Sequence, residues 1–314
     1  MLSQLKQSMR VKLHQVKLRR SMKIEQAAQI IIAHCVAQIQ DSQSAVTESD
    51  DPECIHRMHI GLRHLQSALT LFNEFMFLPE KLQAELGSLS SKLGTAHDWR
   101  LLSDSCLTAI KATAEEPQIL ALRQIALQMA QEREKIAYAA IRSSRYKRLL
   151  SGLSSRIEAP HAPASNYRAH KKKKPCEKLR HFIQKNLRRQ QLHLLKRGDK
   201  LFGKRSEHSP KESHQFRIEV KHARDSCLFF RRFFSKQDMD DYLASLSVLQ
   251  DRLGMINDAV VAGRLLGELG QERGEQVASC SFVRGYLFLQ LRQLQRKLAP
   301  LWKRFHGVNF PRLK

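Results

Sequence analysis

Two short segments carry histidines and cations at the same places, and both kinds of side chain bind phosphate oxygens when charged. The segments span residues 56–64 and 214–222, and each begins and ends with histidine. The eighth place of each segment is a cation, Arg63 in the first and Lys221 in the second. This spacing predicts two copies of one anion-binding element.

The elements that must position these side chains are amphipathic helices. At about 100° per residue, one side of each helix is apolar: Met58, Leu62, Leu65, Leu69 and Phe72 in the first copy, and Phe216, Val220, Ala223, Cys227 and Phe230 in the second. The opposite side carries His56, His59 and Arg63 in the first copy and His214, Arg217, Lys221 and Arg224 in the second, with His64 and His222 flanking. A solvated face would accept charge of either sign, whereas these faces carry few acids. We therefore expect two cationic faces that bind a polyanion.

A second pair of matching segments follows the first. Residues 89–98 and 249–258 both contain Leu-Gly and end in aspartate, Asp98 or Asp258. His214 lies 158 positions after His56, and Asp258 lies 160 positions after Asp98. This nearly constant offset predicts an internal duplication of one helical unit. We expect the two aspartates to act as helix N-caps after the glycines, or as partners that hold the basic helices.

Together these motifs resemble the conserved histidine α-helical domain (CHAD) family, in which a basic histidine-containing helix is followed by Leu-Gly-x-x-Arg/Asn-Asp. Both halves carry the pattern, residues 142–153 resemble the basic, leucine-rich end of the family's first half, and the resemblance spans residues 25–306. His59, His64 and His97 stand where family members usually have arginine, which predicts a weaker first-half site at neutral pH.

The resemblance implies an all-α protein of two pseudo-symmetric helical bundles, whose long basic helices line a central groove or pore. It further implies binding of inorganic polyphosphate without catalysis, cofactor or metal. The candidate contacts combine the two cationic faces with basic residues near the family's groove: His56, Arg63, His64, Arg142, Arg145, Arg188, Arg189, His214, Arg217, Lys221, His222 and Arg224.

Composition points the same way. The 314 residues include 54 Lys and Arg against 30 Asp and Glu, a net charge of +24, and the hydrophobic content of 42% excludes general disorder. A polyanionic partner follows: polyphosphate, nucleic acid or an anionic membrane surface. The six cysteines form no CxxC pair, and the chain shows no signal peptide or membrane span, so we expect reduced thiols and a cytoplasmic location. The polyphosphate binding that the resemblance implies adds the expectation of an association with polyphosphate granules.

The expected organisation is a basic N-terminal helix over residues 1–24, a first bundle over 25–155, a linker over 156–175 and a second bundle over 176–314. Residues 41–53 are acidic and predict a loop, while Gly152 and the prolines that follow it predict the end of the first bundle. The basic run that begins at residues 171–174 predicts the start of a long amphipathic helix.

Two alternative functions remain. Weak, non-specific RNA or DNA binding would use the same cations, but aromatic residues are only 7% of the chain, and those near the motifs fall on the apolar stripes. A metal-dependent phosphohydrolase could use His56, His59, His97 and Asp98. The second copy argues against this enzyme, because it has Arg217 in place of His59 and Asn257 in place of His97.

Overall fold

The computed structural model describes residues 16–48, 52–110, 117–158, 178–202 and 210–314. These residues form α2 (Ile24–Glu48), α3 (Pro52–Leu71), α4 (Glu80–Leu101), α5 (Pro117–Arg142), α6 (Ser144–Glu158), α7 (Leu179–Phe202), α8 (Pro210–Phe229), α9 (Lys236–Glu272), α10 (Val277–Arg296) and α11 (Leu298–His306). A π-helical turn, Leu102–Cys106, extends α4, and two short 3₁₀ turns flank α9. Within the described residues the one β contact is an isolated bridge, Phe234 to Leu313. The predicted all-α class is confirmed.

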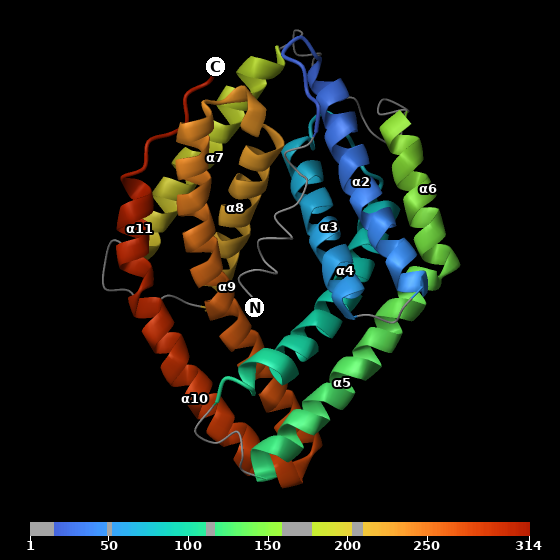
Figure 1. Cartoon of the computed structure of the whole chain (residues 1–314), viewed down its shortest axis with the longest axis vertical. Coiled ribbons are helices and arrows are strands. Elements are labelled where there is room, and N and C mark those ends of the chain that lie inside the picture. The colour runs from blue at the N-terminus through green and yellow to red at the C-terminus, as the bar shows by residue number, and fades with distance from the viewer. Residues whose placement is uncertain (1–15, 49–51, 111–116, 159–177, 203–209) are drawn as a thin grey trace.

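The helices divide into two groups that follow the chain order (Figure 1). Helices α2 to α6 form one side of the molecule, and α7 to α11 form the other. Inside the first group α3 packs on α2 and α4, and α4 packs on α5. In the same way, inside the second group α8 packs on α7 and α9, and α9 packs on α10. Across the molecule α2 contacts α7, α3 contacts α8, α4 contacts α9 and α5 contacts α10. Four helices of the first group therefore each contact the helix at the corresponding place in the second group.

The apolar stripes of the two basic helices build the core. Met58, Leu62 and Leu65 of α3 are buried, as is Phe72 directly after that helix. Phe216, Val220, Ala223 and Cys227 of α8 are also buried, as is Phe230 directly after α8. They belong to one large cluster that continues through both groups of helices. A smaller cluster, built around Trp99, Leu122 and Leu266, joins α4 and α5 to α9 and α10. Because the apolar sides of α3 and α8 are used in this way, their polar sides are held in fixed positions.

Three glycines do not end helices, which corrects our expectation. Helix α6 runs through Gly152 to Glu158, and α4 and α9 run through Gly94 and Gly254. A Cβ atom on Gly152 would lie 2.8 Å from Cδ2 of Leu82, and one on Gly94 would lie 3.2 Å from Cε1 of His59. At these two positions the missing side chain lets a neighbour approach closely, so glycine serves packing and not chain reversal.

Other boundaries also differ from those expected. Helix α2 continues to Glu48, so the acidic segment beginning at residue 41 is mostly helical and not a loop. Residues 16–23 precede α2 as irregular backbone, and the rest of the expected N-terminal helix lies outside the described residues, as do residues 159–175 of the expected linker and the basic run at 171–174. In the described chain, no helix is long and apolar enough to cross a membrane. Among the described residues, Cys35, Cys54, Cys106, Cys227 and Cys280 form no disulfide.

Candidate anion-binding site

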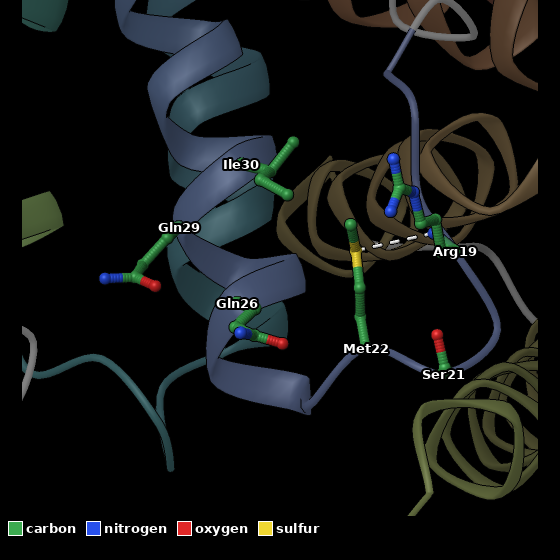
Figure 2. A pocket seen from close by; sticks show the side chains of 6 residues that line it. All are labelled: Arg19, Ser21, Met22, Gln26, Gln29 and Ile30. Atoms are coloured by element: carbon green, nitrogen blue, oxygen red, sulfur yellow. Dashed lines mark hydrogen bonds between the residues drawn. The ribbon is translucent and has the colours of Figure 1, made fainter.

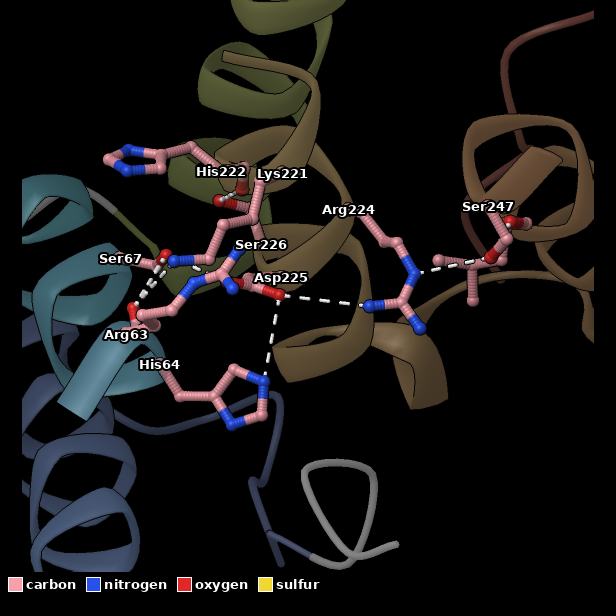
Figure 3. A network of polar contacts seen from close by, with 10 residues as sticks. Arg63, His64, Ser67, Lys221, His222, Arg224, Asp225, Ser226 and Ser247 are labelled. Atoms are coloured by element: carbon pink, nitrogen blue, oxygen red, sulfur yellow. Dashed lines mark hydrogen bonds and ion pairs between the residues drawn. The ribbon is translucent and has the colours of Figure 1, made fainter. Parts of the chain in front are cut away.

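The basic sides of α3 and α8 meet where the two groups of helices join. The Oγ of Ser67 donates a hydrogen bond to Oδ2 of Asp225 at 2.7 Å, and Nζ of Lys221 donates to the carbonyl oxygen of Arg63 at 3.4 Å. Both contacts join residues 158 positions apart, the offset between the two motif copies. Figure 3 shows these side chains converging from the two helices. We call this region the α3–α8 seam. It consists of the contact of Arg63 and Ser67 of α3 with Lys221 and Asp225 of α8, together with the residues around it.

Cations crowd the seam. Burial and then the nearby Arg63 lower the pKa of Lys221 from 10.5 to about 7, with a smaller opposing effect from Asp225. Burial and the neighbouring Arg217 lower the pKa of Arg63. Burial also lowers the pKa of Arg217, which Asp258 and Asp98 partly offset. The positive charges thus destabilise one another, and an anion bound beside them would relieve this repulsion.

Three further candidates border the seam. Burial lowers the pKa of His64 to about 4, although its Nε2 lies 3.9 Å from Oδ1 of Asp225. The pKa of His222 is also lowered, by burial and then by Lys221. The Nε of Arg224 donates to Oγ of Ser247 at 3.2 Å, and its Nη1 lies 4.0 Å from Asp225 (Figure 3). At neutral pH the histidines are therefore uncharged, and the fixed positive charge comes from the arginines.

The carboxylates at the seam order the cations. Asp225 is 1% exposed; burial opposes its ionisation, but His64 and Lys221 hold its pKa below the usual range. Burial and the neighbouring Asp258 raise the pKa of Asp98 to about 6. Asp98 and Asp258 lie inside α4 and α9, so the expected N-cap role is wrong. Their coupling to Arg63 and Arg217 supports the alternative role as partners of the basic helices.

A histidine cluster lies beside the seam in the first half. The Nδ1 atoms of His56 and His97 are 3.1 Å apart, and the His59 ring stacks on His97 with centroids 5.9 Å apart. Burial, followed by Arg63, lowers the pKa of His59 to about 2. The second half has the corresponding contact, 2.9 Å between Nδ1 of His214 and Oδ1 of Asn257. No group of described residues forms a cluster suited to a metal ion.

The structure does not bring every candidate to the seam. The guanidinium of Arg142 lies 5.5 Å from the centre of the Tyr138 ring, and Nε of Arg145 lies 3.6 Å from Oε1 of Glu85. Both arginines stand at the exposed junction of α5 and α6. Arg188 and Arg189 lie on the exposed side of α7, where Arg189 donates to Oδ1 of Asn186 at 2.9 Å. These four cations form outlying basic surfaces.

Sequence patterns missed the polar groups that connect the two helices. Ser67, Ser226 and Ser247 are buried and bonded within or beside the seam. A signal was present, because Ser67 and Asp225 occupy matching places one helical turn after Arg63 and Lys221. A hydroxyl and a carboxylate at equivalent positions could have predicted a contact between the copies.

A separate cavity of about 410 Å³ lies between the segment before α2 and the first turns of that helix. Figure 2 shows its lining residues, Arg19, Ser21, Met22, Gln26, Gln29 and Ile30. Among these lining residues, Arg19 carries a positive charge. Its backbone N–H donates to Sδ of Met22 at 3.4 Å. The cavity thus lacks the line of cations that an extended polyanion needs.

Comparisons with known proteins agree with this architecture. A crystal structure of the CHAD domain from the plant Ricinus communis superposes with a TM-score of 0.82 at 30% identity, covering 95% of this chain and 96% of that one. PptA from Streptomyces chartreusis shares the fold at 12% identity and a TM-score of 0.59, covering 90% and 100% of the two chains. Curated proteins give no significant match. The CHAD domain family matches residues 30–267, and this chain belongs to that family.

Proposed function

We propose that the protein binds inorganic polyphosphate without chemical change, through the α3–α8 seam and the basic surfaces that flank it. The observation that carries this proposal is the crowding of Arg63, Arg217 and Lys221, contributed by both halves, in a partly desolvated place. Such crowding costs stability unless an anion is bound nearby. Membership of the CHAD family supports the same ligand class. The proposal also includes a cytoplasmic location on polyphosphate granules.

Some polar side-chain atoms at the seam have no hydrogen-bond partner among the described residues. Within the described part of the chain, Nε of Arg217 and Nδ1 of both His59 and His64 are buried and make no hydrogen bond. Polyphosphate carries about one negative charge per phosphoryl group and presents oxygens along its whole length, so it matches a row of donors better than a closed pocket does. We assign the first contacts to Arg217, Lys221 and Arg63.

The outlying basic surfaces would extend the same binding. Arg142, Arg145, Arg188 and Arg189 are exposed. A long polymer that leaves the seam would meet such charges, and their contribution would be strongly screened by salt. Short polyphosphates would then depend on the seam alone.

Nucleic acid is the alternative ligand, and a competition experiment separates the two. Phe72, Phe216 and Phe230 are fully buried, so these rings cannot stack on bases. We expect long polyphosphate to displace labelled RNA and duplex DNA at about 150 mM salt, and its length to be unchanged after incubation with Mg²⁺, Mn²⁺ or Zn²⁺. RNA that binds as tightly as polyphosphate would refute the ligand assignment, and released phosphate would refute the non-catalytic one.

Polyphosphate affinity should depend on pH through Lys221. In the free protein its pKa is about 7, and an adjacent phosphate would raise it, so binding takes up a proton. Affinity should therefore fall as the pH rises above about 7. Lys221→Arg keeps its charge and should flatten this dependence. Titrations on both sides of pH 7 test the effect, and a wild-type affinity that is the same on both sides would contradict it.

The pH dependence of the free energy of unfolding, measured without ligand, independently tests the lowered pKa of Lys221. The unfolded chain keeps the lysine proton up to about 10.5, whereas the folded protein loses it above about 7. The unfolded state thus binds more protons in this interval, and the contribution of Lys221 to the free energy of unfolding rises with pH there. Lys221→Gln should remove that part of the pH dependence.

A further inference from the structure

Helix α10 has one covered side and one open side. It packs chiefly on α9 and runs along the outer edge of the molecule (Figure 1). Its inner residues Cys280, Val283 and Leu287 are buried in the smaller core. The inner side of α10 therefore packs in the core, and the outer side is exposed and could contact a partner.

The open side is strongly apolar. Large hydrophobic side chains are exposed along its first four turns: Val277 by 48%, Phe282 by 51%, Tyr286 by 38%, Phe288 by 58% and Leu289 by 64%. At about 100° per residue, Phe282, Tyr286 and Leu289 share one face of the helix. Grouped exposed apolar side chains mark an interaction site more often than scattered ones do.

Positive charge accompanies this apolar face. The segment from Gln276 to Lys314 contains eight Lys and Arg and no Asp or Glu. Arg292 and Arg296 occupy the last turns of α10, and the Arg292 guanidinium lies 5.8 Å from the centre of the Phe288 ring. The partner must therefore accept apolar side chains and carry negative charge.

We propose that α10 docks the protein on an anionic phospholipid surface. Phe282, Tyr286 and Leu289 would enter the boundary between headgroups and acyl chains, while Arg292 and Arg296 contact lipid phosphates. The mixture of aliphatic and aromatic side chains suits a lipid interface, which accepts any apolar group. Position on the outer edge of the molecule suits a planar partner.

Two other occupants fit less well. Single-stranded nucleic acid is held in basic grooves by aromatic rings, whereas α10 is an outer helix whose most exposed large hydrophobic residue is Leu289. A second copy of this chain would bring together two molecules that each carry a net charge of +24. Both occupants become distinguishable outcomes of the test.

The test compares variants of equal charge, because a protein this basic binds anionic vesicles to some extent through charge alone. We would measure sedimentation of the full chain with vesicles of mixed phosphatidylglycerol and phosphatidylcholine at about 150 mM salt. The variant Phe282→Ser/Leu289→Ser should bind at least about tenfold more weakly, since two large side chains lose their apolar burial. Leu192→Ser, which alters a leucine that is 59% exposed on α7, should bind as the wild type does.

Each outcome decides the proposal. Weaker vesicle binding by Phe282→Ser/Leu289→Ser, with unchanged polyphosphate affinity and melting, supports docking through α10 independently of the proposed function. Equal vesicle binding by this variant and the wild type overturns it. A wild-type dimer that the variant converts to monomer overturns it in favour of a contact between copies. Loss of single-stranded RNA binding, with vesicle binding retained, overturns it in favour of nucleic acid.

Discussion

Replacement of Arg217 and Lys221 by glutamine is expected to weaken polyphosphate binding by about a hundredfold or more. Both cations reach the seam from α8, and their suppressed pKa values show that they are partly desolvated there. A charge-assisted hydrogen bond in such a place contributes roughly 1.5–3 kcal/mol, and about 1.4 kcal/mol corresponds to a tenfold change in affinity. Calorimetric titration with polyphosphate measures the loss.

The matched control removes the same charges elsewhere. Lys303→Gln/Arg304→Gln takes one lysine and one arginine from the exposed side of α11, so it lowers the net charge equally and should change affinity only slightly. The seam variant should still fold, because two effects on its stability oppose each other. Removing Lys221 relieves its repulsion with Arg63, whereas removing Arg217 takes away a partner of Asp258. Equal affinities of the two double variants would show that only net charge matters and that the seam is not the binding site.

Phe216→Ala should have the opposite effect, with a large loss of stability and little direct effect on the ligand. The ring is fully buried on the apolar side of α8, in edge-to-face contact with Phe202 and Trp302 at 5.7 Å between centroids. Removing a buried phenylalanine ring costs about 3–5 kcal/mol. Chemical denaturation of the ligand-free protein measures the change.

An exposed phenylalanine gives the comparison for this result. Phe282→Ala alters a ring that is 51% exposed on α10, and we expect a change in stability within about 0.5 kcal/mol. The Phe216→Ala protein should bind polyphosphate as the wild type does, provided that binding is measured at a temperature where this variant remains folded. A destabilisation by Phe216→Ala no larger than that of Phe282→Ala would contradict the packing of α8 described above.

The sequence predicted the features that depend on local periodicity. Apolar side chains at helical spacing identified the buried sides of α3 and α8, and these residues are buried as expected except Leu69, which is partly buried. The doubled motif predicted that His56 and His214 occupy equivalent places, and each meets a residue of the following long helix, His97 or Asn257. Such features follow from the sequence because helix geometry alone fixes which side chains share a face.

Glycines and acidic residues did not predict the helix boundaries correctly. Gly152 and Gly94 lie within helices because the adjoining helix needs the space that a side chain would fill. The polar residues from 41 to 48 are helical although their composition suggested a loop. Local propensity is weak compared with packing, so these boundaries depended on neighbours that no single segment of sequence reveals.

The tertiary structure alone decided what covers the polar sides of the basic helices. Periodicity placed Arg63 and Lys221 opposite the apolar stripes, which equally describes two surfaces open to water. The fold instead brings α3 against α8 through positions 158 apart, so that Ser67 meets Asp225 and Lys221 meets Arg63. The burial and crowding that lower the pKa values of Arg63 and Lys221 arise from this contact, whereas Arg142, Arg145, Arg188 and Arg189 stay exposed. The sequence determines the faces of each helix, but the pairing of faces depends on how all the helices fill space together.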